Sequence, residues 1–329
     1  MPLSVLEMCA GAGGQALGLE RAGFEVACAI DVDGDCCRTL RANRPAWKVM
    51  EGSIAGLDGT RFRGIDLLAG GIPCPPFSIA GKQLGESDDR NLFPEALRLI
   101  AEIRPAAVML ENVPGFAHRR FDGYRQMLFE KLDRLGYDAE WRLLNACWFG
   151  VPQLRPRFSL VAFRGRFTSS FKWPKPDGNL PPTIGEAVGD LMASRGWLGA
   201  RRWRKRANGI APTIVGGSKK HGGPDLGPTR ARRQWAAYGV DGLGIANEPP
   251  GPENAPGFIP RLTVRMAARL QGFPDCWTIS GGKTAAYRQV GNALPPPFSE
   301  AVAKAISRGL AGWAPPLQEK LPLVASTSK

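Results

Sequence analysis

One cysteine is held in a loop of prolines and glycines. Cys74 stands in the run GGIPCPPFS, which directly follows IDLLAGG, a run that we predict to be a β-strand. Core cysteines usually sit inside apolar runs, so a thiol between prolines favours a positioned nucleophile over a core residue. In a sheet of parallel strands, the loops after the strands form the ligand crevice, and we expect Cys74 to act there.

An acidic residue ends the next predicted strand. Glu111 follows the five apolar residues AAVML, and this position costs free energy unless the carboxylate is paired or functional. A glutamate that reaches solvent at a strand end is the alternative. Because Cys74 follows a neighbouring strand, the two residues together predict a thiol nucleophile and an acid in one crevice.

Two arginines precede the last strand of this region, in the run QLRPRFSLVAF. The alternation of side chains along a strand would place Gln153, Arg155 and Arg157 on one face. Their guanidinium groups are suited to binding a phosphate or orienting a carboxylate, and a strip of surface salt bridges is the alternative.

A glycine cluster follows the first predicted strand. Gly11, Gly13 and Gly14 open a helix, and Asp31 closes the second strand, 20 residues after Gly11. Glycines let the backbone approach a ligand at a helix N-terminus, and the carboxylate can accept hydrogen bonds from both ribose hydroxyls. The pattern predicts a nucleotide-like cofactor but does not separate a nicotinamide from S-adenosylmethionine. A tight turn with a solvated aspartate is the alternative.

The elements that position these residues alternate along the first 165 residues. We predict strands over 4–10, 25–32, 65–71, 106–113 and 158–164, with helices over 13–23, 34–45, 92–104 and 124–136. Strands that alternate with helices at this spacing are typical of an α/β fold with a doubly wound, mostly parallel, Rossmann-like sheet.

The composition changes at about residue 167. The segment 167–260 is rich in Pro, Gly, Arg and Trp, and it predicts a second, smaller domain of short strands and loops. Helical patterning returns over 263–273 and 299–313. The domain boundaries that we predict are a catalytic and cofactor-binding domain over 1–175 completed by 285–315, a second domain with a hinge over 176–284, and a disordered tail over 316–329.

The charge is concentrated in the second domain. Of a net charge of +13, residues 191–235 carry +10, from eleven Lys or Arg and one acid, Asp225. Basic segments tend to meet polyanions, with a solvated surface as the alternative. The chain has no apolar run of membrane-spanning length and no signal-peptide pattern, so we expect a cytoplasmic protein. Seven cysteines without a CxxC pair, and two histidines, predict neither a metal site nor a disulfide framework.

Five motifs in one order resemble the DNA (cytosine-5) methyltransferase family of the bacterial type, with a single target-recognition region. They are EMCAGAGG, GGIPCPPFS, ENV, QLRPR and RQVGNALPP, and the resemblance covers residues 3–165 and 260–305. It implies S-adenosylmethionine as the cofactor, S-adenosylhomocysteine as its product, and duplex DNA as the substrate. The second domain would be the target-recognition domain.

The resemblance also implies roles. Cys74 would add to C6 of a flipped cytosine, so that C5 can take the methyl group, and Glu111 would protonate or hydrogen-bond N3. Arg155 and Arg157 would lie near the flipped base and the catalytic loop. No residue can be assigned to remove the C5 proton.

The cofactor positions implied by the resemblance show two departures. Asp31 stands where the family usually has Glu, and Ser53-Ile54 stands where an Asp often contacts the adenine amino group. The implied cofactor-binding residues are Cys9, Ala10, Gly11, Gly13, Gly14, Asp31, Val32, Ser53, Ile54, Pro73, Leu92 and Asn292. Pro75 replaces the Gln that usually follows the catalytic Cys, and Met266 replaces a usual Glu.

The DNA contacts are predicted from charge and from a Thr-Ile pair that resembles the family's Thr-Leu dipeptide. The predicted residues are Ser78, Arg201, Arg202, Arg204, Thr213, Ile214, Gly216, Lys219, Arg230, Arg232 and Arg233. Which of the residues from Arg230 to Gln234 reads bases stays open. We expect a monomer, with a cognate restriction endonuclease as a candidate partner. A tRNA methyltransferase of the same family, a catalytically silent DNA-binding protein and a nicotinamide dehydrogenase are the alternative functions.

Overall fold

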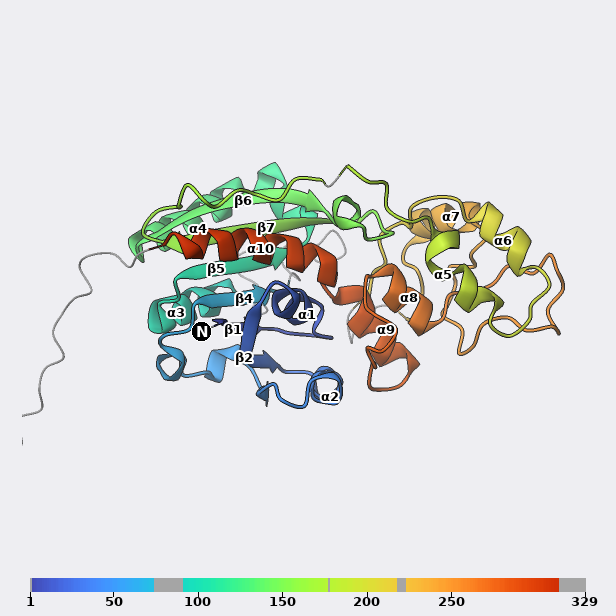
Figure 1. Cartoon of the computed structure of the whole chain (residues 1–329), viewed down its shortest axis with the longest axis horizontal. Coiled ribbons are helices and arrows are strands. Elements are labelled where there is room, and N and C mark those ends of the chain that lie inside the picture. Colours follow the sequence, from blue (N-terminus) through green and yellow to red (C-terminus); the bar gives the residue numbers. More distant parts are fainter. Residues whose placement is uncertain (1, 74–90, 177, 218–222, 314–329) are drawn as a thin grey trace, which may run out of the picture.

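A single sheet of seven strands organises the first half of the chain. The computed structural model describes residues 2–73, 91–176, 178–217 and 223–313. The strands lie in the order β3-β2-β1-β4-β5-β7-β6 (Figure 1). Their bounds are β1 Leu3–Met8, β2 Phe24–Asp31, β3 Val49–Glu51, β4 Leu67–Gly71, β5 Ala107–Asn112, β6 Tyr137–Asn145 and β7 Pro156–Arg164. Strands β1 to β5 pair in parallel, and β7 runs antiparallel to β5 and β6, which confirms the predicted α/β sheet.

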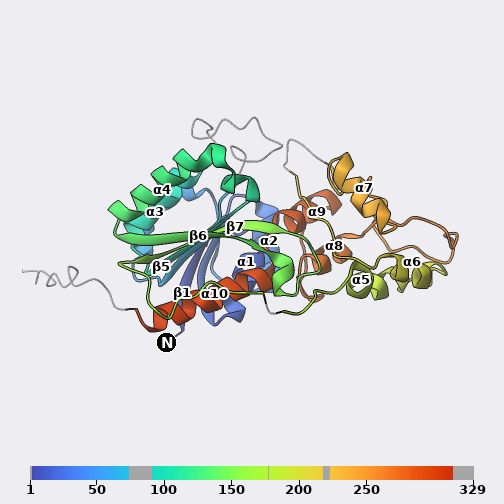
Figure 2. The same cartoon turned by 90° about the horizontal axis from the view of Figure 1, so that it is seen from above.

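Helices cover both faces of the sheet (Figure 2). One face shares its core with α1 (Gly14–Arg21), α2 (Gly34–Asn43) and α10 (Pro296–Ala311), and the other with α3 (Phe93–Ile103) and α4 (Asp122–Arg134). Short 3₁₀ segments are η1 Ile54–Gly56, η2 Gly59–Phe62, η4 Pro114–Ala117, η5 Arg119–Phe121 and η6 Ala146–Phe149. The carboxyl ends of β1, β2, β4 and β5 therefore meet at one edge, where ligands bind in such sheets.

The last helix returns to the first. The Cβ of any larger residue at position 18 of α1 would stand 2.7 Å from the backbone nitrogen of Glu300, so Gly18 allows α10 to pack closely. Ser299 donates a hydrogen bond from its Oγ to the carbonyl oxygen of Gln15 at 2.9 Å. Residues separated by most of the chain therefore form one layer over the sheet.

The segment 167–260 is helical where it is regular. It contains α5 (Ile184–Ala193), α6 (Ala200–Arg206) and α7 (Thr229–Ala237), and α8 (Val264–Leu270) and α9 (Lys283–Asn292) follow. The prediction of short strands is wrong: the described residues of this segment form isolated bridges at Ala211 and Ala246 but no strand. The helices are short and each buries few apolar residues, so Pro and Gly dominate the local composition and hide the helical period.

The segment that we predict to be the target-recognition domain with its hinge, residues 176–284 (the recognition region), packs on the predicted first domain. Its core gathers the tryptophans at positions 197, 203, 235 and 277, and it also includes Ala12 from the glycine loop and Leu17 from α1. The indole of Trp277 donates a hydrogen bond to the carbonyl oxygen of Ala12 at 3.0 Å. The glycine loop and the recognition region therefore share a packed boundary.

No helix among the described residues is both long and apolar enough to cross a membrane.

Candidate active site

A buried ion pair lies at the carboxyl edge of the sheet. Arg157 of β7 approaches Glu111 of β5, with 2.8 Å between its Nε and Oε1, and both side chains are buried. Burial raises the pKa of the Glu111 carboxyl, while the positive charges of Arg157 and Arg155 oppose that rise. A buried carboxyl with a raised pKa that is also held by a guanidinium is suited to deliver a proton to a base inserted beside it.

The same edge is where the Cys74 loop begins. Gly71 is the register partner of Glu111, and a Cβ at Gly71 would stand 3.2 Å from Oε2 of that carboxylate. The amide of Asn112 donates to the carbonyl oxygen of Ile72 at 3.2 Å, which ties the end of β5 to the residue after β4. Glu111 thus faces the point from which the chain leads to Cys74, and Cys74 itself lies outside the described residues.

Another cysteine near the crevice is not a competing nucleophile. Burial raises the pKa of the Cys9 thiol to about 12, and the negative charges of Asp31 and Glu7 add to the rise. A thiol in this environment stays protonated at neutral pH, and the thiolate is the reactive form. Cys9 has a φ of 53°, an unusual backbone conformation that shapes the glycine loop.

Asp31 orders the glycine loop. Its Oδ2 accepts a hydrogen bond from the backbone N–H of Gly11, and its Oδ1 accepts one from Asp33, both at 2.8 Å. Gly11 has a φ of +55°, and a Cβ built there meets no atom within 4 Å, so its side opens into free space. Val32, next to Asp31, is an apolar side chain that is 74% exposed. The loop therefore offers a backbone cradle, a carboxylate and an exposed apolar surface.

The other two glycines serve packing. A Cβ at Gly13 would stand 2.6 Å from Cδ2 of Leu40, and one at Gly14 would collide with the carbonyl oxygen of Leu294. These positions need glycine because the start of α1 packs against α2 at Gly13 and against the returning C-terminal segment at Gly14. Ala10 in the same loop is buried. Their predicted cofactor contacts can come from the backbone alone.

The remaining predicted cofactor residues lie on neighbouring elements. Ser53 follows β3, whose Glu51 is the register partner of Asp31, and its Oγ accepts from the N–H of Ala55 at 3.2 Å. Ile54 is buried, so an adenine could meet this segment only at its backbone or at Ser53. The other three are Pro73, which is exposed after β4, Leu92, which begins α3, and Asn292, which ends α9.

Arg155 is separated from the ion pair and joins the two domains. Its Nη1 donates to the carbonyl oxygen of Ile214 at 2.6 Å, and its Nη2 donates to those of Gly291 at 2.7 Å and Ala293 at 3.0 Å. The Arg155 side chain is fully buried, and burial together with the charge of Arg157 lowers its pKa. The alternative of a surface salt-bridge strip is wrong, because both arginines are buried.

Gln153 and Gln271 extend this joint, a role that no sequence pattern predicted for either residue. Gln153 accepts from the N–H of Ile214 at 2.9 Å and donates to Oε1 of Gln271 at 2.6 Å. Gln271 in turn donates to the carbonyl oxygen of Ala293 at 2.6 Å. The alternation in QLRPR predicted that Gln153 shares a face with the arginines, but not that this face meets the recognition region.

The family model of C-5 cytosine-specific DNA methylases matches residues 3–308 of this chain. The chain belongs to the C-5 cytosine-specific DNA methylase family. It is therefore a DNA (cytosine-5) methyltransferase.

Curated relatives cover nearly the whole methylase. It is 54% identical over 312 residues to the type II methyltransferase M.NaeI of Lentzea aerocolonigenes, an alignment that covers 94% of this chain and 75% of the relative. It is 50% identical over 313 residues to the type II methyltransferase M.NgoMIV of Neisseria gonorrhoeae, covering 94% of this chain and 99% of the relative.

Solved structures share the fold. A mutant of Spodoptera frugiperda DNMT2 matches with a TM-score of 0.64 and 17% identity, over 94% of this chain and 99% of that one. Entamoeba histolytica methyltransferase EhMeth matches with a TM-score of 0.65 and 14% identity, over 94% and 98%. At these identities the likeness concerns the fold alone.

Several of the predicted DNA-binding residues of the methylase contact other parts of the protein. Ile214 is fully buried, and its backbone groups bind Gln153 and Arg155, so its side chain packs the joint. Thr213 donates to the carbonyl oxygen of Leu154 at 2.6 Å. Gly216 allows its backbone to pack closely against α9. Asn292 donates to the carbonyl oxygen of Gly217 at 3.2 Å.

The basic residues of α6 are partly structural. Arg206 donates to the carbonyl oxygen of Ala236 at 2.9 Å, where its positive charge favours the C-terminal end of α7. The stem of Arg204 lies against Gly185 and Gly189 of α5. Arg201 and Arg202 are exposed, as are Arg230 and Arg233 on α7. Ser78, Lys219 and the predicted tail over 316–329 lie outside the described residues.

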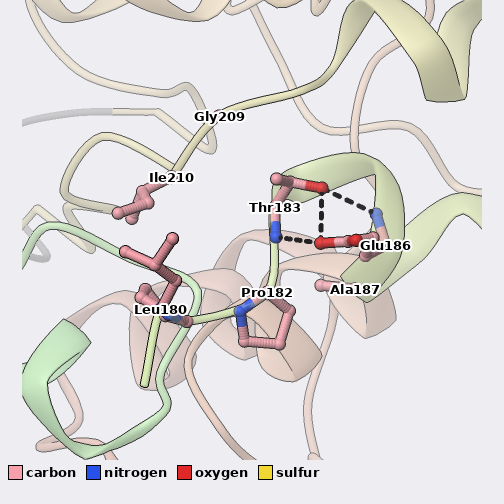
Figure 3. A pocket seen from close by; sticks show the side chains of 8 residues that line it. Leu180, Pro182, Thr183, Glu186, Ala187, Gly209 and Ile210 are labelled. Carbon is pink, nitrogen blue, oxygen red and sulfur yellow. Dashed lines mark hydrogen bonds between the residues drawn. The ribbon is translucent and has the colours of Figure 1, made fainter. Parts of the chain in front are cut away.

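A surface hollow of about 760 Å³ lies beside the start of α5 (Figure 3). Leu180, Pro182 and Ile210 line it, and its one acid, Glu186, is engaged in a capping box with Thr183. Thr183 donates to Oε2 of Glu186 from its backbone N–H at 2.8 Å and from its hydroxyl at 2.9 Å, and these bonds lower the pKa of Glu186. The hollow therefore lacks a free chemical group and is not the active site of the methylase.

Within the described ranges, no group of three His, Cys, Asp or Glu residues could hold a metal ion.

Arg155→Met is expected to destabilise the methylase by at least about 1–3 kcal/mol. The change leaves the carbonyl oxygens of Ile214, Gly291 and Ala293 without their donor, and one unsatisfied buried acceptor already costs that much. Urea unfolding followed by circular dichroism measures the effect. Arg202→Met, on the exposed face of α6, is the matched control, and equal midpoints for the two variants would show that Arg155 does not hold the joint.

Proposed function

We propose that this methylase is the sequence-specific modification enzyme of a type II restriction–modification system. It would transfer the methyl group of S-adenosylmethionine to a cytosine flipped out of duplex DNA. The observation that carries the proposal is the buried Glu111–Arg157 pair beside the start of the Cys74 loop. The base must leave the stack because C6 cannot be reached by a side chain inside a duplex.

Each protein group has one task in this reaction. The Cys74 thiolate forms a bond to C6 while Glu111 supplies a proton to N3, and the displaced ring electrons make C5 nucleophilic. After C5 has accepted the methyl group, a base removes the C5 proton, and the electrons of that C–H bond restore the C5–C6 double bond and expel the Cys74 thiolate from C6. N3 returns its proton to Glu111. Arg157 keeps the Glu111 carboxyl oriented.

The residues of the glycine loop fit S-adenosylmethionine, whose charged sulfur carries the transferable methyl group. The free space at Gly11 admits a ligand against the backbone, and Asp31 can accept from ribose hydroxyls. Val32 offers an exposed apolar surface to an adenine ring. The product released would be S-adenosylhomocysteine.

Asp31→Ala is expected to weaken S-adenosylmethionine binding by about 1–3 kcal/mol, the range for a hydrogen bond to a charged group. The loss has two sources: the ribose acceptor disappears, and Gly11 loses the partner that orders the cradle. Isothermal titration calorimetry measures the affinity. Asp31→Asn is the matched control, since its amide oxygen can still accept from Gly11, and unchanged affinity in Asp31→Ala would leave Asp31 with a turn-forming role only.

Bisulfite sequencing tests the proposed function as a whole. DNA from cells that express the methylase should retain unconverted cytosines within one short sequence. Methylation spread over all contexts, or absent, would contradict the proposal. We further propose duplex DNA as the partner, a monomeric enzyme, a cognate endonuclease, and a cytoplasmic location where bacterial DNA lies.

A further inference from the structure

One face of α7 carries exposed side chains at a helical repeat, and three of the four are polar. Arg230, Arg233, Gln234 and Ala237 are exposed, at positions i, i+3, i+4 and i+7. Trp235 on the other side is fully buried. The exposed side of this nine-residue helix is therefore one continuous surface.

Arg232 belongs to the supporting side. Its Nη2 donates to Oγ1 of Thr229 at 3.3 Å, and its Cγ lies 3.0 Å from the position of a Cβ on Gly242. Among the residues that the structure describes, neither Arg230 nor Arg233 has an ion-pair partner. Two guanidinium groups thus extend from α7 with their donors available to a ligand.

The N-terminal end of α7 is linked to the active site through short contacts. A Cβ at Gly227 would stand 2.9 Å from Cγ2 of Val215, and one at Gly291 would stand 2.5 Å from the nitrogen of Gly216. Arg155 donates to the carbonyl oxygens of both Ile214 and Gly291. Two positions further along the chain, Arg157 forms the ion pair with Glu111. Packed residues therefore connect the start of α7 to the catalytic pair.

The far end of α7 is anchored as well. Arg206 binds the carbonyl oxygen of Ala236, and the N–H of Val240 donates to the carbonyl oxygen of Trp235 at 3.1 Å. In Figures 1 and 2, α6 lies farther from the sheet than α7, and Figure 2 shows α7 on the side of the molecule where α3 and α4 lie. A helix anchored in this way holds its exposed side chains more precisely than a loop would.

We propose that α7 is the base-reading helix, with Arg230 and Arg233 each donating to O6 and N7 of a guanine in the major groove. Arginine makes this bidentate contact more often than any other specific contact to a base, and a major groove admits a helix. Residues 230 and 233 are about 4.5 Å apart along the helix axis, which is between one and two base-pair steps of about 3.4 Å. The inference rests on the proposed sequence-specific function and assigns that specificity to named residues.

The experiment compares R230A and R233A with wild type on defined duplexes. The recognition sequence of the wild type is first found by bisulfite sequencing of a methylated duplex library. Methylation is then measured as kcat/KM on the cognate duplex and on duplexes with one guanine replaced. We expect each variant to lose about 5- to 150-fold on the cognate duplex and to stop discriminating at one guanine, while other positions stay selective.

The matched control is the double variant R201A/R202A, compared with R230A/R233A. Both remove two arginines from exposed helical positions of the recognition region, one pair from α6 and the other from α7. Base preference should survive in the α6 variant and fall in the α7 variant. Melting temperature and S-adenosylmethionine affinity verify that both variants are folded.

Three outcomes would overturn the inference. Equal weakening on every duplex, with the slope of log affinity against log salt reduced by about 0.9 per arginine, would make Arg230 and Arg233 phosphate contacts. Unchanged kinetics would make the α7 face a solvated surface. A wild type without any sequence preference would overturn the proposed function together with this inference, whereas the first two outcomes leave the proposed function intact.

Discussion

Cys74→Ser is expected to reduce methyl transfer to background while the protein still folds and binds S-adenosylmethionine. A serine hydroxyl is almost entirely protonated at neutral pH, and C6 of cytosine accepts only a strong nucleophile. Without addition at C6, C5 stays too electron-poor to take the methyl group. Transfer of a radiolabelled methyl group to DNA measures the loss, and calorimetry with the cofactor verifies the fold.

A second measurement isolates the covalent step. Wild type should form a stable adduct with duplex DNA that carries 5-fluorocytosine, because fluorine at C5 cannot leave as a proton does. The adduct should survive a denaturing gel, and Cys74→Ser should form none. Cys276→Ser, which changes an exposed thiol, is the matched control and should form the adduct. Full turnover by Cys74→Ser would exclude this mechanism.

Glu111→Gln is expected to lower kcat by about 10²- to 10⁴-fold, the usual contribution of one general acid. The glutamine keeps the shape of the side chain and loses the proton that N3 requires. It also removes the negative charge opposite Arg157, so a stability measurement must accompany the kinetics. Steady-state methylation with and without preformed enzyme–DNA complex separates kcat from binding.

The dependence of the methylation rate on pH tests whether Glu111 donates the proton. Because burial raises the pKa of Glu111, the carboxyl keeps its proton to a higher pH than an exposed glutamate would. The rate should therefore decline on the alkaline side as Glu111 loses that proton, and Glu111→Gln should lack this decline. Arg157→Met removes the positive charge that opposes the rise in the pKa of Glu111. The alkaline decline in the rate of this variant should therefore move to higher pH. A decline at unchanged pH in Glu111→Gln would assign it to another group.

The strands that build the site could be predicted because they are buried on both faces. β1, β2, β4 and β5 are nearly continuous apolar runs, which is the signature of parallel strands between two helical layers. β6 was missed because it is an edge strand: YDAEWRLLN mixes charged and apolar residues and only its ends are well buried. β3, with three residues, is too short to give a pattern.

The local sequence pattern does not predict which groups the two arginines bind. Alternation predicted that Arg155 and Arg157 share one face, and both side chains are buried in the structure. The partners of the two side chains come from segments that no local pattern connects to QLRPR: β5 for Arg157, and the residues around 214 and 292 for Arg155. Helix α9 was not predicted, because its sequence KTAAYRQVGN contains a glycine, which is untypical of a helix. This glycine serves close packing against a distant segment, which no local pattern reveals.

The contact between α1 and α10 has a consequence for how the chain acquires its structure during synthesis. The Ser299–Gln15 bond closes a loop of 284 residues, and closing a flexible loop of that length costs about 5 kcal/mol of entropy. The groove at Gly18 remains uncovered on the ribosome until residues 296–311 emerge. The recognition helices are complete before then, so we expect the DNA-facing part to mature first and the catalytic layer to close last. Because this contact joins residues far apart in the chain, we expect refolding of the released enzyme to be slow.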